Sequence, residues 1–82
     1  MIIIYTTNWC SSCNMAKSLL NEKGLSFKEI NIEEKNMTRD DLKELTGGAT
    51  VPQIVIGDQH VGGNIELQKL DGEGKLDSLV SA

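Results

Sequence analysis

The sequence contains only two cysteines, Cys10 and Cys13, and a single histidine, His60. A secreted domain of this size that depends on disulfides would usually carry about four or more cysteines, so the count argues against an oxidising compartment. Zinc sites within one chain usually need four ligands, mostly cysteine and histidine, and these three residues are too few. We therefore expect a cytoplasmic protein whose two cysteines serve another chemistry.

Long runs of one kind of residue are also missing. The 12 acidic and 8 basic residues are interspersed, give a net charge of −4, and include no basic block of the kind that tracks phosphates. The apolar run at residues 1–4 is too short for a signal-peptide core or a membrane span, and no basic segment precedes it. We expect no nucleic-acid partner, no membrane association and a mature chain that begins near Met1.

Repeats, low-complexity tracts and linkers are absent from the 82 residues. Domains usually need at least about 50 residues, so a second domain would have no core of its own. We expect residues 1–82 to form a single domain with one modest core, and the protein to be a monomer.

The first third of the chain has the pattern of strand, helix and strand. Residues 2–5 are β-branched or aromatic and apolar on both faces, which predicts a strand in the middle of a sheet. Residues 11–23 have apolar side chains at helical spacing, and Gly24 ends the helix. Residues 25–32 alternate as a second, parallel strand with an irregularity near Lys28 and Glu29.

The remainder predicts a short helix, a hairpin and a final helix. Thr38 and Asp41 mark the start of a helix whose narrow apolar face is Leu42 and Leu45. Residues 53–56 and 59–61 flank a turn at Gly57 and form a hairpin. A helix capped by Asn64 follows, carrying Ile65, Leu67 and Leu70, and the chain ends in one or two further helical turns with Leu76, Leu79 and Val80. The order β-α-β-α-β-β-α predicts an α/β fold with a mixed four-stranded sheet flanked by helices.

The two cysteines are three residues apart at the start of a predicted helix. That spacing puts them on one face about one turn apart, close enough for a disulfide. Cys10 lies at the helix end, where unpaired N–H groups favour a thiolate, and Cys13 lies a turn deeper. We interpret Cys10 as the nucleophile and Cys13 as the resolving thiol. A pair of buried structural thiols is the competing interpretation.

Activation of Cys10 should be mild. A helix end stabilises a charge by about 0.3–2 kcal/mol, which lowers a pKa by roughly 0.2–1.5. No basic residue lies between Tyr5 and Met15 to add to this effect. Trp9, predicted to be exposed in the preceding turn, is either a contact for partner proteins or structural. We interpret His60 as a half-buried strand residue and Lys17 as a solvated charge.

Two backbone features complete the pattern. Pro52 begins a strand that should lie near the sheet centre, and a cis bond after Val51 would explain it. That turn would leave the N–H and C=O of Val51 free to pair with a peptide-like substrate. The Gly62-Gly63 pair before a helix start would let a ligand approach the backbone, or simply make a tight turn.

Together these motifs resemble a short bacterial glutaredoxin. The resemblance runs over about residues 2–80, and the combination of CxxC, Thr-Val-Pro and Gly-Gly at these separations is highly specific. The segments that carry it are Ile4-Tyr5-Thr6, Cys10-Ser11-Ser12-Cys13, Lys23-Gly24-Leu25-Ser26-Phe27, Thr50-Val51-Pro52-Gln53-Ile54, Gln59-His60-Val61-Gly62-Gly63, and Leu70-Asp71 with Gly74 and Leu76-Asp77.

The resemblance implies a thioredoxin-like fold, glutathione as the reductant, and disulfide-containing proteins as substrates. Cys10 would attack disulfides or form the mixed disulfide with glutathione. The glutathione groove would fall on Thr50, Val51 and Pro52, and the γ-glutamyl carboxylate would meet Gly63, Asn64 and Ile65.

Four positions depart from the family pattern. Proline and tyrosine are usual between the cysteines, where this chain has Ser11 and Ser12, and a basic residue is usual where Thr7 stands. An acidic residue is common where Ile65 stands. Ser11, in the place of the usual proline, opens one alternative. This is a [2Fe–2S] cluster held between two chains by Cys10 of each and two glutathiones. The changes at Thr7 and Ile65 open another, a dithiol protein reduced by a thioredoxin reductase.

Overall fold

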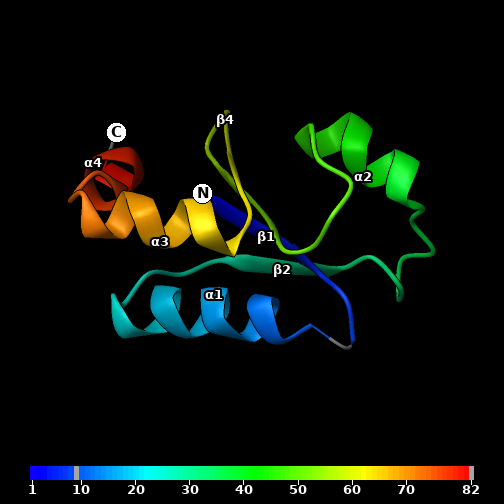
Figure 1. Ribbon diagram of the computed structural model, residues 1–82, viewed down its shortest axis with the longest axis horizontal. Helices are drawn as coiled ribbons and strands as arrows, with labels where there is room; N and C mark the ends of the chain where they lie inside the picture. Colours follow the sequence, from blue (N-terminus) through cyan, green and yellow to red (C-terminus); the bar gives the residue numbers. More distant parts are fainter. Residues whose placement is uncertain (9, 82) are drawn as a thin grey trace.

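A mixed four-stranded β-sheet forms the centre of the protein (Figure 1). The computed structural model describes residues 1–8 and 10–81, the last of these without its side chain. The strands lie in the order β2-β1-β3-β4, with β1 parallel to β2 and the other pairs antiparallel. Their bounds are β1 Ile2–Thr6, β2 Lys28–Asn31, β3 Gln53–Ile56 and β4 Gln59–Gly62. The predicted sheet is confirmed.

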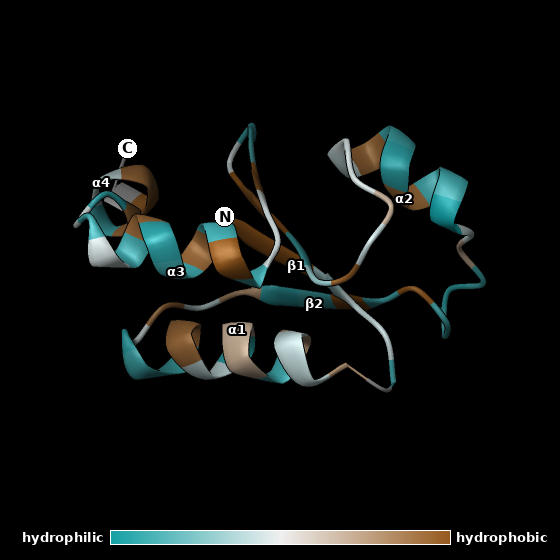
Figure 2. Cartoon of the chain, in the orientation of Figure 1, coloured by the Kyte–Doolittle hydropathy of each residue, from teal (hydrophilic) through white to brown (hydrophobic). Residues whose placement is uncertain are grey.

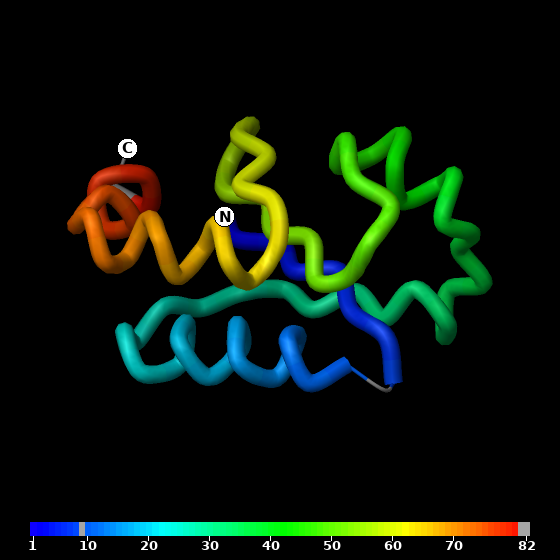
Figure 3. The backbone as a smooth tube through the Cα atoms, viewed as in Figure 1, coloured from blue at the N-terminus to red at the C-terminus, as the bar shows by residue number. Residues whose placement is uncertain are grey.

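Helices cover both faces of the sheet. Helices α1 (Ser11–Glu22), α3 (Asn64–Gly72) and α4 (Leu76–Ser81) pack on one face, and α2 (Arg39–Thr46) packs on the other. In Figure 3 the green trace of α2 lies at the opposite end of the molecule from the red trace of α4. None of the described helices has the length and apolar character needed to cross a membrane.

β1 is buried because it contributes to a hydrophobic cluster on each face. Ile2 and Ile4 belong to the cluster under α1 and α3, whereas Tyr5 belongs to the cluster under α2. Figure 2 shows β1 in brown and the start of β2 in teal, which distinguishes the central strand from the outer one. The prediction that residues 2–5 form a central strand is confirmed.

The second strand differs from the prediction. β2 covers only Lys28–Asn31, and its pairing with β1 is continuous, so the irregularity predicted near Lys28 and Glu29 is wrong. The pattern of apolar residues shifts from odd to even positions there because Phe27 packs with the cluster under α1, whereas Ile30 packs with the cluster under α2 on the other face of the sheet. The register shift of this sheet lies instead between β3 and β4, at Ile54 and Val55.

Two helix details also differ. α2 has the predicted capping box of Thr38 and Asp41, but Leu45 is 52% exposed, and the buried residues are Leu42 and Thr46. α3 is capped at Gly63 rather than at Asn64, which is its first helical residue. Gly63 has no side chain that could accept an N–H of the first turn, and the Glu66 carboxylate instead accepts the Gly63 N–H at 3.2 Å.

Candidate active site

The two cysteines lie at the start of α1 and are joined by a disulfide, with their Cα atoms 5.2 Å apart. Cys10 is the N-cap residue, and its Sγ accepts the Cys13 N–H at 3.0 Å. The sulfur thus occupies the place that a serine or aspartate oxygen usually takes at a helix start. The prediction that the CxxC opens a helix is confirmed.

The two sulfurs differ in their access to solvent. Cys13 is 1% exposed beneath the first turn of α1, whereas Cys10 is partly exposed. The first intrahelical bond runs from the Asn14 N–H to the Cys10 carbonyl at 3.2 Å, which fixes the turn that carries both residues. A disulfide partner approaching from solvent therefore meets Cys10 first.

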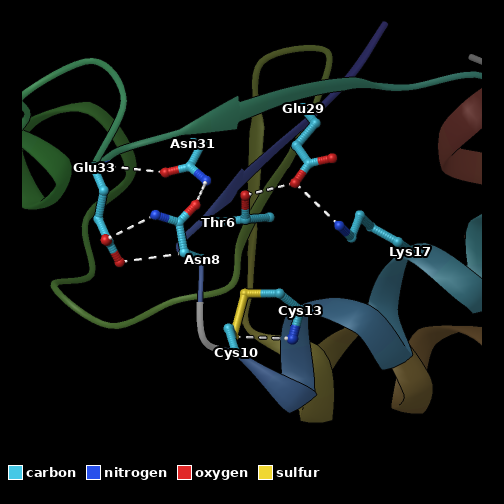
Figure 4. Close-up of polar contacts among 8 residues, drawn as sticks. All are labelled: Thr6, Asn8, Cys10, Cys13, Lys17, Glu29, Asn31 and Glu33. Atoms are coloured by element: carbon cyan, nitrogen blue, oxygen red, sulfur yellow. Dashed lines mark hydrogen bonds and ion pairs between the residues drawn. A yellow bond between two sulfur atoms is a disulfide. The ribbon is translucent and has the colours of Figure 1, made fainter.

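Three polar side chains connect α1 to the sheet beside the cysteines (Figure 4). The buried Thr6 hydroxyl donates to Glu29 at 2.7 Å, and the Lys17 ammonium lies 3.1 Å from the same oxygen. The Thr6 hydrogen bond, followed by the Lys17 contacts, lowers the pKa of the Glu29 carboxyl below its ordinary value of 4.5. Lys17 is therefore paired with a carboxylate, and its interpretation as a solvated charge is wrong.

The Val51–Pro52 peptide bond is cis, as the sequence predicts. No hydrogen bond among the described residues engages the main-chain N–H or C=O of Val51. Both groups stand at the end of the segment that enters β3 and are open to an external partner.

A cavity of about 470 Å³ brings most of the predicted site residues together. It extends from Ser12, between the two cysteines, to the start of α3, and neither cysteine is among the described residues that line it. The six residues predicted for a glutathione groove all line it, namely Thr50, Val51, Pro52, Gly63, Asn64 and Ile65.

The paired glycines lie where the two walls of this cavity meet. Gly62 has φ +111°, a conformation that side chains rarely adopt. A Cβ on Gly63 would lie 3.4 Å from the Pro52 carbonyl oxygen. The start of α3 therefore lies at ordinary contact distance from the cis-proline segment, and the positive φ of Gly62 fits a tight turn between β4 and α3.

Sequence reasoning missed part of the lining. Gln53 is buried, donates to the Thr50 hydroxyl at 3.3 Å, and lies where a Cβ on Gly48 would come within 2.6 Å of its Nε2. The Gly47-Gly48 pair is the signal that the sequence offers, because a glycine pair leaves room for a neighbouring side chain. The lining residues that were not predicted are Thr46, Gly47, Gly48, Gln53, His60 and Glu66, whereas Gly62 belongs to the predicted glycine pair.

Charge is sparse in the cavity. Among the described lining residues only His60 and Glu66 carry titratable side chains. His60 is exposed on β4, so its interpretation as a half-buried strand residue is wrong. Trp9 lies outside the described residues. Within the described part of the chain, no three histidine, cysteine, aspartate or glutamate side chains gather as a metal site would require.

Comparison with known proteins finds the same family along nearly the whole chain. The glutaredoxin family model matches residues 2–61. The chain is 49% identical over 81 residues to a glutaredoxin of Pseudomonas aeruginosa, covering 99% of this chain and 96% of that protein. It is 44% identical over 77 residues to glutaredoxin 3 of Escherichia coli, covering 94% and 93% of the two chains.

Solved structures agree with the sequence relatives. The solution structure of a glutaredoxin from Brucella melitensis has a TM-score of 0.83 at 47% identity, covering 96% of this chain and 86% of that one. A buckwheat glutaredoxin, solved in complex with glutathione, shares the fold with a TM-score of 0.88 at 24% identity, covering 98% and 76%. With its thioredoxin-like fold and its Cys10–Cys13 pair, the chain belongs to the glutaredoxin family of thiol–disulfide oxidoreductases.

Proposed function

We propose that this protein uses glutathione to reduce protein disulfides and glutathione mixed disulfides, with Cys10 as the attacking thiol and Cys13 as the resolving thiol. The observation that carries the proposal is the unequal solvent exposure of the two disulfide-bonded cysteines. Cys10 is the partly exposed N-cap of α1, and Cys13 is 1% exposed one turn deeper. The unpaired N–H groups and the dipole of the helix end favour negative charge on Cys10 after reduction.

The reaction is a sequence of thiol–disulfide exchanges. The Cys10 thiolate attacks a substrate disulfide, forms a mixed disulfide, and releases one substrate sulfur as a thiolate that takes a proton. With a protein substrate, Cys13 then attacks the Cys10 sulfur, which releases the second substrate thiol and leaves the Cys10–Cys13 disulfide. Two glutathione molecules reduce this disulfide and become glutathione disulfide. A glutathione mixed disulfide needs only Cys10.

The cavity beside Ser12 is the proposed glutathione groove. The free N–H and C=O of Val51 would pair with the main chain of the cysteinyl part, as one strand pairs with another. The start of α3 at Gly63, Asn64 and Ile65 would hold the γ-glutamyl carboxylate, and because Glu66 already accepts the Gly63 N–H, the donors would be the N–H groups of Asn64 and Ile65. Thr50 and Pro52 complete the wall against which the tripeptide lies.

The charge of the cavity bears on which reductant the protein uses. No lysine or arginine is among the described residues lining the cavity, and Thr7 stands where the family usually has a basic residue. A groove without that charge would hold glutathione less tightly, and a thioredoxin reductase is the alternative source of electrons.

The experiment is steady-state reduction of a glutathionylated peptide by the purified protein. One reaction contains glutathione and glutathione reductase, and the other contains thioredoxin reductase as the only source of electrons. We expect turnover with glutathione. Turnover only in the reaction with thioredoxin reductase would show that the protein is a dithiol reductant that takes its electrons from thioredoxin reductase rather than from glutathione.

A second candidate function rests on Ser11 and on the exposure of Cys10. A [2Fe–2S] cluster shared by two chains needs four thiolates, and the single exposed thiol of each chain plus two glutathiones would supply them. A solved structure 47% identical to this chain concerns metal binding of glutaredoxins. Anaerobic purification with glutathione tests this function, since it predicts a brown dimer, and a colourless monomer would exclude it.

Three further expectations belong with the proposal. We propose that residues 1–82 act as one domain, because strands from both halves of the chain share the sheet. We propose a monomer for the reductase and the cytosol as its compartment, where thiols are kept reduced.

A further inference from the structure

Asn8 lies two residues before Cys10, in the segment that joins β1 to α1, and it is exposed. Its polar groups nevertheless have protein partners (Figure 4). Its N–H donates to Glu33 Oε1 at 3.3 Å and its Nδ2 donates to Glu33 Oε2 at 3.1 Å. Its Oδ1 accepts from Asn31 Nδ2 at 2.7 Å. The end of β2 and the turn after it thus hold every polar group of the Asn8 side chain.

Asn31 is oriented by its own bonds to the main chain. Its Oδ1 accepts the N–H of Glu33 at 3.0 Å and the N–H of Glu34 at 3.3 Å. Since the amide oxygen faces these donors, the amide nitrogen faces Asn8. Asn8, Asn31 and Glu33 therefore form a closed set of hydrogen bonds, which we call the Asn8 clamp.

A single exposed hydrogen bond exchanges with water at little cost, but bonds that share the same three side chains support one another. The clamp is made by exposed or half-exposed residues and fills no core, so packing does not explain it. What it does fix is the position of Asn8, two residues before Cys10, against the end of β2.

The start of α1 depends on the position of Cys10. α1 has no acidic residue in its first turn, and its side-chain cap is the Cys10 sulfur itself. The sulfur reaches the Cys13 N–H only while Cys10 stays extended, at φ −146° and ψ 100°. A segment that entered from another direction would carry the sulfur away from the helix end.

We propose that the Asn8 clamp positions the segment leading to Cys10 and so keeps the Cys10 sulfur at the N-cap of α1. The inference rests on the proposed function in taking Cys10 as the attacking thiol. Asn8, Asn31 and Glu33 are positioning residues, because none of their hydrogen bonds among the described residues involves a cysteine sulfur. Their effect is on the fraction of time that the Cys10 thiolate is stabilised by the helix end.

The test is the pH profile of Cys10 alkylation by iodoacetamide in the reduced protein, with mass spectrometry to identify the modified residue. In Asn8→Ala we expect alkylation at about pH 6 to slow roughly threefold to tenfold, because less Cys10 is thiolate there. At a pH where Cys10 is fully ionised the rates should converge. A variant that lost only stability would melt earlier and keep the wild-type profile, which would overturn the proposal.

Further variants separate the clamp from simpler effects. Asn31→Ala leaves the sequence of the segment before Cys10 unchanged but removes one member of the clamp. It should slow alkylation in the same way. Glu33→Ala and the double variant with Asn8→Ala complete a cycle in which the double variant should be no slower than either single one. Independent, multiplying effects would contradict the clamp. Glu34→Gln is the matched control, since it removes a neighbouring charge whose side chain bonds to none of the described residues.

The same data keep the two proposals apart. If alkylation of the wild-type protein occurs at Cys13 rather than at Cys10, the proposed roles of the cysteines are wrong. If Cys10 is the reactive residue but Asn8→Ala and Asn31→Ala keep its pH profile, the proposed function stands and the positioning role is wrong.

Discussion

Lys23 joins the end of α1 to the last two helices, because its Nζ lies 2.7 Å from Asp71 Oδ1 and 3.3 Å from Asp77 Oδ1. The Asp71 hydrogen bond, with Asp77 adding to it, raises the pKa of Lys23 above its ordinary value of 10.5. Lys23 is also the C-cap residue of α1, so one side chain holds three helix ends together.

Alkaline unfolding should report this contact. A raised pKa in the folded state means that the stability contributed by Lys23 is fully present below 10.5 and is lost as the pH rises through the folded pKa. In Lys23→Met we expect lower stability at neutral pH and a smaller alkaline loss, measured by urea unfolding at a series of pH values. Lys75→Met is the control, since Lys75 is 66% exposed and lies 3.9 Å from Glu73, and it should change neither quantity.

The Thr6 hydroxyl should control the acid side of the stability curve. Because the folded pKa of Glu29 is lowered, its stabilising effect is present above 4.5 and is lost as the pH falls through the folded pKa. Thr6→Val should raise the pKa of Glu29 and lower the unfolding free energy at neutral pH by about 1 kcal/mol, since Glu29 is partly exposed. Carboxyl NMR titration and urea unfolding would measure both.

Thr7→Val serves as the control for that variant, because the Thr7 hydroxyl bonds to none of the described residues. An unchanged titration of Glu29 in Thr6→Val would show that the hydroxyl does not govern the carboxylate.

The two cysteines should be unequal in their effects on activity. Cys10→Ser removes the attacking thiol, and we expect turnover to fall by about 10³-fold or more with every substrate. Cys13→Ser should keep the reduction of a glutathionylated peptide and lose the reduction of a protein disulfide that needs the internal bridge. Equal losses in the two variants with the glutathionylated peptide would contradict the assigned roles.

Thr7→Lys should strengthen the binding of glutathione and lower KM for glutathionylated substrates. The added ammonium would stand three residues before Cys10 in the sequence, and an exposed charge pair with a glutathione carboxylate would contribute about 0.2–1 kcal/mol. We expect KM for a glutathionylated peptide to fall by about 1.5-fold to fivefold at low salt and the effect to shrink as salt is added. Thr7→Met, which adds length without charge, should leave KM unchanged.

Leu42 and Leu45 provide a matched pair on α2. Leu42 is fully buried against Tyr5 and Ile32, so Leu42→Ala should lower the unfolding free energy by about 2–5 kcal/mol. Leu45 is 52% exposed, and Leu45→Ala should change it by about 0.5 kcal/mol or less. Chemical denaturation of the two variants measures the difference, and similar losses would mean that α2 packs through another face.

Local chemistry explains what the sequence could predict. The apolar residues 2–5, Gly24, the Thr38 capping box and the Gly57 turn each act within a few residues, and the structure confirms each of them. The cis bond before Pro52 and the gathering of six groove residues followed from the family resemblance.

The misses depend on contacts between distant segments. Leu45 faces solvent and Thr46 is buried because the sheet meets α2 on the side that Leu42 and Thr46 share, which an eight-residue helix does not reveal. Lys17 pairs with Glu29 only because β2 lies beside α1 in the folded chain. Gln53 reaches the groove because Gly48 leaves room for it.

The outer strands of the sheet have a consequence for the protein at high concentration. β2 is four residues long and exposes Lys28 and Glu29, and β4 is set out of register with β3 at Ile54 and Val55. A growing aggregate needs a long, regular row of unpaired main-chain groups on which the next chain adds a strand. Short length and charge on one side, and a local kink on the other, deny that template to neighbouring molecules.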